Sequence, residues 1–308
     1  MAPVWNLDPI MFYIPGLGWP VRYYGLIFSL VFIGGFFLFR WQILRAGREA
    51  MASPRPGKKK AKQQVTGSAP PRTGPGSEDE AFGFILPGAL GVVLGARLGH
   101  VFFYNFDKFM SDPAWLFRIW EGGLASHGAT LGLITALWYH SRHWKRPFWD
   151  TCDRFSFSAA LGAAMVRLGN FLNSEIVGKV TDSRFGIRFP LYDGKPPELT
   201  LARYPSQLAE FGLGLMILAF LFWLDARLGR EKRPVGALSA AFLILYFCGR
   251  FLVEFIKERH GQVDDFILSR GQLLSLPGVA LGILLAIWVY QNQKRQTEVR
   301  RSNAPPNH

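Results

Sequence analysis

Seven apolar stretches divide this chain, and they constrain its fold more than any other feature of the sequence. A helix needs roughly 20 mostly apolar residues to cross the hydrocarbon core of a bilayer, so each stretch predicts one membrane-spanning helix. The stretches are residues 23–43, 82–104, 123–141, 150–173, 206–226, 236–257 and 272–291. We therefore expect an all-α integral membrane protein with seven transmembrane helices and a small external, or periplasmic, region between helices 4 and 5.

The basic residues predict the orientation of the chain in the membrane. The formal net charge is +13 although 49% of the residues are hydrophobic, and Lys and Arg concentrate in residues 44–81, 142–149 and 227–235 and in the C-terminal tail. By the positive-inside rule these segments are cytoplasmic, which puts the N-terminus outside, the C-terminus in the cytoplasm and residues 174–205 outside. The basic runs alternate with apolar segments and do not form one basic surface, so we expect no nucleic-acid partner.

We expect a single transmembrane domain over residues 1–295, followed by a cytoplasmic tail at residues 296–308. Within it, residues 44–81 are rich in Pro, Gly, Lys and Ser, a composition that predicts a disordered basic cytoplasmic loop. Only Cys152 and Cys248 are present, so neither a disulfide framework nor a thiolate metal site is indicated, and we expect no metal. Glycines at three- and four-residue steps predict close helix packing. They are Gly88, Gly91, Gly95, Gly99, Gly128 and Gly132.

Six of the seven apolar stretches carry polar side chains near the predicted outer boundary of the membrane. Such side chains are costly in lipid and normally face a partner, a cavity or a substrate. They are Tyr24, Arg97, His100, Tyr104, His127, Arg167, Asn170, Ser206, Gln207, Glu210, Tyr246, Arg250 and Glu254. Arg167 and Arg250 would repel each other at similar depth unless Glu175 and Glu254, or a lipid phosphate, neutralised them. For His100 we favour a structural hydrogen bond.

Several motifs resemble those of the bacterial prolipoprotein diacylglyceryl transferase family. Residues 122–128 read Gly-Gly-Leu-Ala-Ser-His-Gly, and residues 167–178 read Arg-Leu-Gly-Asn-Phe-Leu-Asn-Ser-Glu-Ile-Val-Gly. Further landmarks follow in the family's order at residues 23–26, 96–104, 205–208, 246–254 and 271–275. The resemblance covers nearly the whole chain outside residues 44–81. Ser174 departs from the pattern, because many members have glycine there.

The resemblance implies a catalytic transmembrane domain in the bacterial inner membrane. Its expected reaction moves the diacylglyceryl group of phosphatidylglycerol to the thiol of the lipobox cysteine of a prolipoprotein. A thioether forms and glycerol phosphate leaves, which is the first step of lipoprotein maturation. The implied partners are phosphatidylglycerol, prolipoprotein signal peptides with a lipobox cysteine, and membrane lipids. No cofactor is required, because the donor carries its own leaving group.

The resemblance also implies site residues. The expected catalytic residues are His127, Arg167, Asn170, Arg250, Tyr24 and Glu175, and the expected substrate-binding residues are Arg167, Arg250, Tyr246, Glu254, Arg97, Gly122 and Gly178. His127 would take the thiol proton, since histidine side chains titrate near neutral pH, and the two arginines would hold the phosphate. Glu175 is the alternative candidate for the base that takes the thiol proton. The alternative function is a membrane protein that binds or moves phosphatidylglycerol without chemistry, which would leave His127 without a role.

Overall fold

The computed structural model describes residues 2–52, 76–258 and 268–302, and this part of the chain is mostly helical. Five helical stretches are long and apolar enough to cross a membrane: Tyr23–Glu49, Glu78–Tyr104, Phe148–Leu172, Ser206–Arg227 and Arg270–Val299. One shorter apolar helix, Ala237–Val253, accompanies them. The chain is therefore a multi-pass, mainly α-helical membrane protein.

Each of the seven expected spans coincides with a helix, but two of these helices are weaker membrane spans than expected. α9 (Ala237–Val253) has 17 residues and is shorter than the apolar stretch at 236–257. α5 (Ser126–His143) is not one of the five spans, because histidine, serine and threonine side chains along it lower its hydropathy. The count of seven membrane crossings therefore stays a prediction.

The connection at residues 44–81 is shorter than expected. α1 (Tyr23–Ala52) continues beyond residue 43, since the residues that follow include Leu, Arg, Ala, Glu and Met, which favour helix. α2 (Glu78–Phe82) begins after Ser77, whose hydroxyl accepts a hydrogen bond of 3.2 Å from the backbone of Glu80 as an N-cap. The disorder expected for residues 53–75 lies outside the described residues. α10 (Arg270–Ser302) likewise extends into the expected tail at 296–308.

The chain divides into two compact units. The first combines Met1–Leu38 with Phe155–His308, and the second is Phe39–Arg154. The boundary falls inside α1 and α6 (Phe148–Leu172), so each of these helices contributes to both units. The single domain expected over residues 1–295 stays a prediction.

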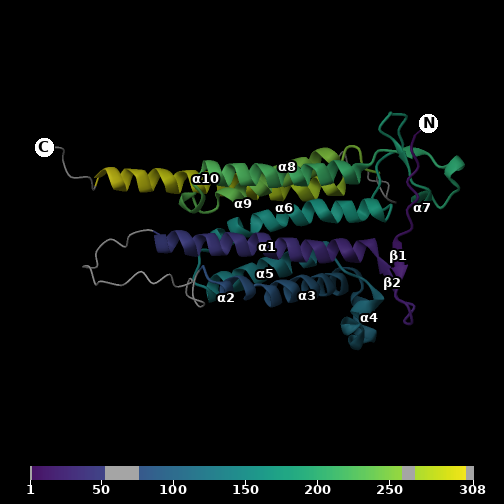
Figure 1. The fold of residues 1–308 in the computed structure, drawn as a ribbon, viewed down its shortest axis with the longest axis horizontal. Coiled ribbons are helices and arrows are strands. Elements are labelled where there is room, and N and C mark those ends of the chain that lie inside the picture. Colours follow the sequence, from purple (N-terminus) through teal and green to yellow (C-terminus); the bar gives the residue numbers. More distant parts are fainter. Residues whose placement is uncertain (1, 53–75, 259–267, 303–308) are drawn as a thin grey trace. The chain divides into compact units, whose positions relative to one another are not determined.

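The first unit is built on α8 (Ser206–Arg227), α9 and α10, which run side by side in green to yellow in Figure 1. Its core consists of Phe157, Ala160, Ile217, Leu221 and Leu238 from α6, α8 and α9. The first half of α1 joins α6 through a hydrogen bond of 2.7 Å from the Ser158 hydroxyl to the Gly35 carbonyl. This packing holds α6 and α8 together, so the polar residues at their ends can meet.

Residues 174–205, expected as an external loop region, have a fold of their own in the first unit. β3 (Ile187–Arg188) pairs antiparallel with β4 (Ala202–Arg203), and α7 (Pro190–Asp193) and the 3-10 helix Pro197–Leu199 lie between them. Phe171, Val177 and Phe189 form a small core beneath. The Trp5 indole packs against this core and donates a hydrogen bond of 3.0 Å to the Phe171 carbonyl.

A polar network also holds this region. The Tyr192 hydroxyl donates a hydrogen bond of 2.5 Å to Glu258, and Arg203 pairs with both Glu258 and Asp193. Burial and the hydrogen bond to Glu258 raise the pKa of Tyr192 to about 12. A second small hairpin, β1 (Ile10–Tyr13) with β2 (Pro20–Arg22), precedes α1. The all-α expectation therefore holds for the membrane spans but not for these two hairpins.

In the second unit, α3 (Ile85–Tyr104) and α5 run alongside each other with glycines at their contact. Figure 1 shows the two helices together in blue and teal. A Cβ atom on Gly132 would collide with the Gly91 carbonyl oxygen, and one on Gly128 would collide with the Gly95 carbonyl oxygen. The close approach expected from the glycine spacing is confirmed.

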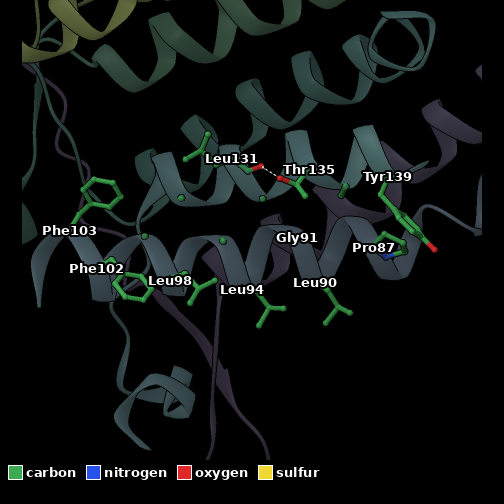
Figure 2. A pocket seen from close by; sticks show the side chains of 15 residues that line it. Pro87, Leu90, Gly91, Leu94, Leu98, Phe102, Phe103, Leu131, Thr135 and Tyr139 are labelled. Carbon is green, nitrogen blue, oxygen red and sulfur yellow. Dashed lines mark hydrogen bonds between the residues drawn. The ribbon is translucent and has the colours of Figure 1, made fainter. Parts of the chain in front are cut away.

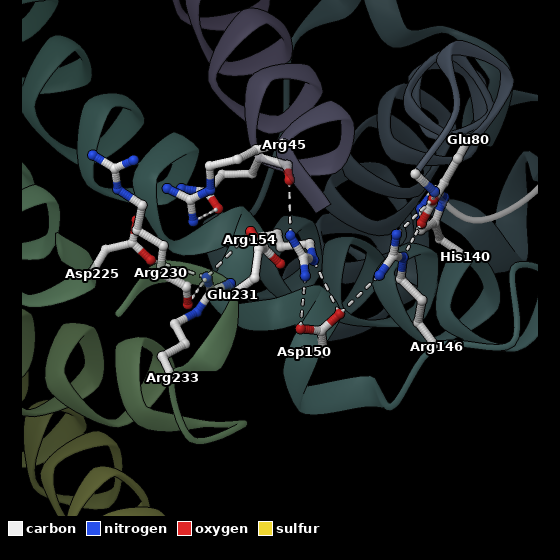
Figure 3. Close-up of polar contacts among 12 residues, drawn as sticks. Arg45, Glu80, His140, Arg146, Asp150, Arg154, Asp225, Arg230, Glu231 and Arg233 are labelled. Carbon is white, nitrogen blue, oxygen red and sulfur yellow. Dashed lines mark hydrogen bonds and ion pairs between the residues drawn. The ribbon is translucent and has the colours of Figure 1, made fainter. Parts of the chain in front are cut away.

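A buried ion-pair network lies in the second unit where α5 ends and α6 begins (Figure 3). Glu80 is fully buried, accepts a hydrogen bond of 2.9 Å from Arg146 and lies 3.8 Å from His140. Asp150 contacts Arg146 at 3.3 Å and Arg154 at 3.0 Å. Because these residues come from α2, α5 and α6 and from the loop before α6, the network fixes that end of the unit.

Candidate functional site

The end of α6 carries a compact polar cluster in the first unit. The Tyr24 ring lies against the backbone of Gly169, and its hydroxyl interacts with the Asn170 side chain, near the charges of Arg167 and Glu175. Asn170 is 3% exposed; its Oδ1 accepts a hydrogen bond of 3.4 Å from Arg167, and its Nδ2 donates one of 3.3 Å to Glu175. Four of the six expected catalytic residues therefore lie together.

The turn after α6 holds Glu175 in an unusual backbone. Ser174 has φ +54° and Ile176 has φ +55°, so left-handed residues flank Glu175 on both sides. Two residues at the start of α8 hold this turn, since Gln207 donates to the Glu175 carbonyl at 2.7 Å and Ser206 donates to the Ile176 carbonyl at 3.0 Å. The left-handed backbone explains why glycine suits the position of Ser174.

A chain of alternating charges extends from Arg167 away from the cluster. The Nε of Arg167 lies 3.1 Å from Glu210, and the other oxygen of Glu210 accepts a hydrogen bond of 3.1 Å from Lys257. Glu254 lies 3.7 Å from Lys257 and accepts a hydrogen bond of 3.1 Å from Ser269.

These contacts differ from one of the two alternatives above, in which Glu175 and Glu254 neutralise the arginines. Glu210, not Glu175 or Glu254, pairs with Arg167, and Glu254 pairs with Lys257. Sequence reasoning did not assign Lys257 to the site. Its position three residues after Glu254 was the available signal, because that spacing brings the two side chains together at a helix end.

Arg250 differs from Arg167 in its surroundings. It is partly buried near the end of α9, and among the described residues its side chain has no hydrogen bond or ion pair. Tyr246, one helical turn earlier, stacks on Phe242 with ring centroids 5.5 Å apart and packs against the core of the first unit. Arg250 therefore carries a positive charge that no described side chain neutralises.

Gly178 lies where the backbone is too crowded for a side chain. A Cβ atom there would lie 2.5 Å from the Tyr204 carbonyl oxygen and 2.7 Å from the Ile256 carbonyl oxygen. Its N–H donates a hydrogen bond of 2.9 Å to Tyr204. The contacts of Gly178 are thus structural, joining the segment after α6 to the ends of β4 and α9.

His127 belongs to the second unit, at the start of α5. The side chain is exposed, with the Phe103 ring 5.0 Å away edge-on and the Tyr104 ring 5.7 Å away. Within residues 2–52, 76–258 and 268–302, nothing hydrogen-bonds to its imidazole. His127 is thus accessible to a ligand and is positioned only by aromatic packing.

Arg97 and Gly122 organise the loop that precedes α5. Arg97 is 2% exposed and donates hydrogen bonds to the carbonyls of Leu116, Trp115 and Gly122, the last at 2.6 Å. Gly122 has φ +81°, which favours glycine. The N–H donors of Arg97 therefore bind backbone carbonyl groups of this loop.

His100 has the structural hydrogen bond that the sequence analysis favoured, with its ring nitrogen 2.9 Å from the Asn105 side chain.

Comparison with known proteins connects these residues to a family. The sequence profile of the family described as prolipoprotein diacylglyceryl transferase matches residues 9–288. A phosphatidylglycerol–prolipoprotein diacylglyceryl transferase of Vibrio cholerae is 38% identical over 297 residues, covering 96% of each chain. One from Vibrio campbellii is 37% identical over 298 residues, covering 96% of this chain and 95% of the relative. One from Actinobacillus pleuropneumoniae is 42% identical over 207 residues, covering 66% of this chain and 75% of the relative.

Proposed function

The chain belongs to the prolipoprotein diacylglyceryl transferase family, and we propose that it performs the reaction for which its relatives are named. It transfers the diacylglyceryl group of phosphatidylglycerol to a prolipoprotein cysteine, and is thus a transferase of lipoprotein biosynthesis. The thiol sulfur attacks the glycerol carbon, the carbon–oxygen bond to the phosphate breaks, and glycerol phosphate leaves. The thiol proton passes to a base, and a thioether remains.

The observation that carries the proposal is the polar cluster at the end of α6. Tyr24, Arg167 and Asn170 belong to membrane-spanning helices, where polar groups are costly unless they serve a partner or a substrate. Asn170 donates a hydrogen bond to Glu175, whose side chain is exposed at the end of the span. A cluster of this kind suits a substrate with a polar headgroup at the membrane boundary.

Arg250 and Arg167 are the proposed phosphate-binding residues. Arg250 has no counter-charge among the described residues, which suits an anionic ligand. Arg167 is paired with Glu210, but Lys257 shares that carboxylate and so offsets its charge. Arg167 thereby keeps positive charge for a phosphate, while Glu210 and Asn170 fix the direction of its guanidinium.

His127 is the proposed base for the thiol, with Glu175 as the other candidate. Its exposure and the lack of a hydrogen-bond partner in the described chain leave its ring nitrogens available for a proton. Tyr24 and Asn170 complete the polar site. Arg97, Gly122 and Gly178 would act on substrate through the backbone segments that they shape. Tyr246 and Glu254 are further proposed substrate-binding residues.

The remaining proposals concern the membrane. We place the protein in the bacterial inner membrane as one catalytic domain with seven crossings, the N-terminus outside and the C-terminus cytoplasmic. The alternation of basic connections and apolar spans supports this orientation. The proposed partners are phosphatidylglycerol, prolipoprotein signal peptides with a lipobox cysteine, and the surrounding lipids.

The test is incubation of the purified protein with phosphatidylglycerol and a lipobox peptide, scored by mass spectrometry. A diacylglyceryl mass gain on the peptide cysteine is expected. Binding of phosphatidylglycerol without a mass gain would favour the alternative, a protein that binds or moves lipid.

Arginine-to-lysine variants test the phosphate clamp. Arg167→Lys and Arg250→Lys should each lose most of the transfer rate, because lysine is a point charge and cannot make two parallel hydrogen bonds to a phosphate. Arg295→Lys, on an exposed part of α10, serves as the matched control and should keep full activity. Full activity in both site variants would show that positive charge alone suffices.

A further inference from the structure

An apolar groove runs along the contact between α3 and α5. Its volume is about 590 Å³, and α3 contributes Leu90, Leu94, Leu98 and Phe102 to its walls while α5 contributes Leu131 and Tyr139. Figure 2 shows the α3 residues in one row at four-residue steps. The glycines at the helix contact form the floor of the groove.

The groove ends next to His127. Phe103 lines the groove, and its ring lies 5.0 Å from the His127 ring. Gly128, which follows His127 in the chain, also lines the groove. An apolar segment in this groove therefore has its end at the residue proposed to take the thiol proton.

The length of the groove distinguishes between possible occupants. The lining of α3 runs from Pro87 to Phe103, which corresponds to about 24 Å of helix. A lipid in one leaflet reaches only about half of the roughly 30 Å hydrocarbon core. The apolar region of a signal peptide has about 7 to 15 residues, or roughly 10 to 22 Å as a helix. The groove matches that helix better than it matches an acyl chain.

The walls of the groove also suit a helix. A row of side chains at four-residue steps forms a ridge against which the grooves of another helix can pack. The glycines of the floor hold the backbones of α3 and α5 close together, and packing of this kind is what drives helices together inside a membrane. Exposed fractions of 54% for Leu94 and 60% for Leu131 show that this surface is open.

We propose that the groove between α3 and α5 binds the apolar helix of the prolipoprotein signal peptide and so positions the substrate cysteine beside His127. This inference rests on the proposed function. With its basic end in the cytoplasm, the peptide would run parallel to α3 and present the cysteine that follows its apolar region at the outer end of the groove.

Kinetics with two peptides test the proposal. One peptide carries the whole signal sequence, and the other carries only the lipobox and lacks the apolar region. Leu131→Trp, which narrows the groove, should raise the KM for the long peptide about tenfold and leave the KM for the short peptide unchanged. Ile134→Trp is the matched control, because Ile134 is 46% exposed on the same helix and does not line the groove. It should leave both values unchanged.

Two kinetic results would overturn the proposal. A higher KM for phosphatidylglycerol with both peptides would assign the groove to an acyl chain, and unchanged KM values in Leu131→Trp would show that the long peptide does not use it. Crosslinking gives an answer independent of transfer. A photoreactive amino acid in place of Leu98 should capture the long peptide, while the same group in place of Ile134 should not.

The two hypotheses fail in different ways. A wild-type protein that gives no mass gain with either peptide contradicts the proposed function. In that case capture at Leu98 still decides whether the groove binds a signal peptide. Equal capture at both positions, or none at Leu98, would overturn the groove proposal.

Discussion

His127 is the residue whose role in the chemistry is easiest to separate from a role in folding. Its imidazole makes ring contacts with Phe103 and Tyr104 and has no hydrogen bond in the described part of the chain. Its replacement therefore breaks no polar contact with another described residue. A change in activity can then be attributed to the imidazole itself.

For His127→Gln we expect a loss of transfer rate of roughly a hundred-fold to ten-thousand-fold, as is typical when a general base is removed. Part of the rate should return as the pH rises, because the substrate thiol, with a pKa near ~8.5, then ionises without help. The measurement is the pH profile of peptide mass gain. His143→Gln, an exposed histidine on the same helix, is the control and should keep the wild-type profile.

Two outcomes would change this assignment. An active His127→Gln variant with the wild-type profile would make His127 a structural residue. An inactive variant without recovery at high pH would move the base to another group, with Glu175 next in line.

Ser174 gives a second prediction at this scale, for stability. Its φ of +54° costs a residue with a Cβ atom about 1 to 2 kcal/mol, and its buried hydroxyl has no hydrogen bond to any described residue. Ser174→Gly should therefore raise the free energy of unfolding by about 1 kcal/mol, seen as a higher midpoint of thermal unfolding in detergent. Ser174→Ala also removes the hydroxyl but keeps the Cβ atom, so the glycine variant should be the more stable of the two. A glycine variant less stable than the alanine variant would contradict this account.

At the scale of elements, the contact between α3 and α5 is the most sensitive to side-chain size. Gly132→Ala would put a Cβ atom against the Gly91 carbonyl oxygen and should cost about 1 to 3 kcal/mol. Gly212→Ala is the matched control, since open space surrounds Gly212 in α8, and it should gain up to about 1 kcal/mol from helix propensity. Thermal unfolding of both variants measures the difference. Equal stability would show that the two helices can separate at little cost.

At the scale of the whole molecule, the orientation in the membrane is the main prediction. Basic residues at 44–81, 142–149 and 227–235 should retain those connections in the cytoplasm, while residues 174–205 should be outside. Reporter fusions within residues 55–75 should give cytoplasmic signals, and fusions within residues 183–195 should give external ones. An external signal from residues 55–75 would reverse the orientation and remove the argument that placed the polar side chains near the outer boundary.

The amino-acid sequence by itself determined where the helices form and which neighbouring residues of the motif contact each other. Bilayer thickness sets the length that an apolar span needs, and each expected stretch coincides with a helix, five of them in helical stretches long and apolar enough to cross. Residues close in sequence are also close in space, which is why the contacts among Arg167, Asn170 and Glu175 could be expected from the motif. The helix ends were less predictable, because residues 44–52 are polar yet still favour helix.

Long-range contacts were decided by the tertiary structure. The sequence does not indicate that Glu210 of α8 would pair with both Arg167 of α6 and Lys257 beyond α9, because these residues are far apart in the chain and meet only when three helix ends pack together. Likewise, the role of Arg97 depends on a loop whose carbonyl groups reach its guanidinium. Hydropathy and motif spacing act along the chain, whereas the partner of a buried charge depends on which elements fold beside it.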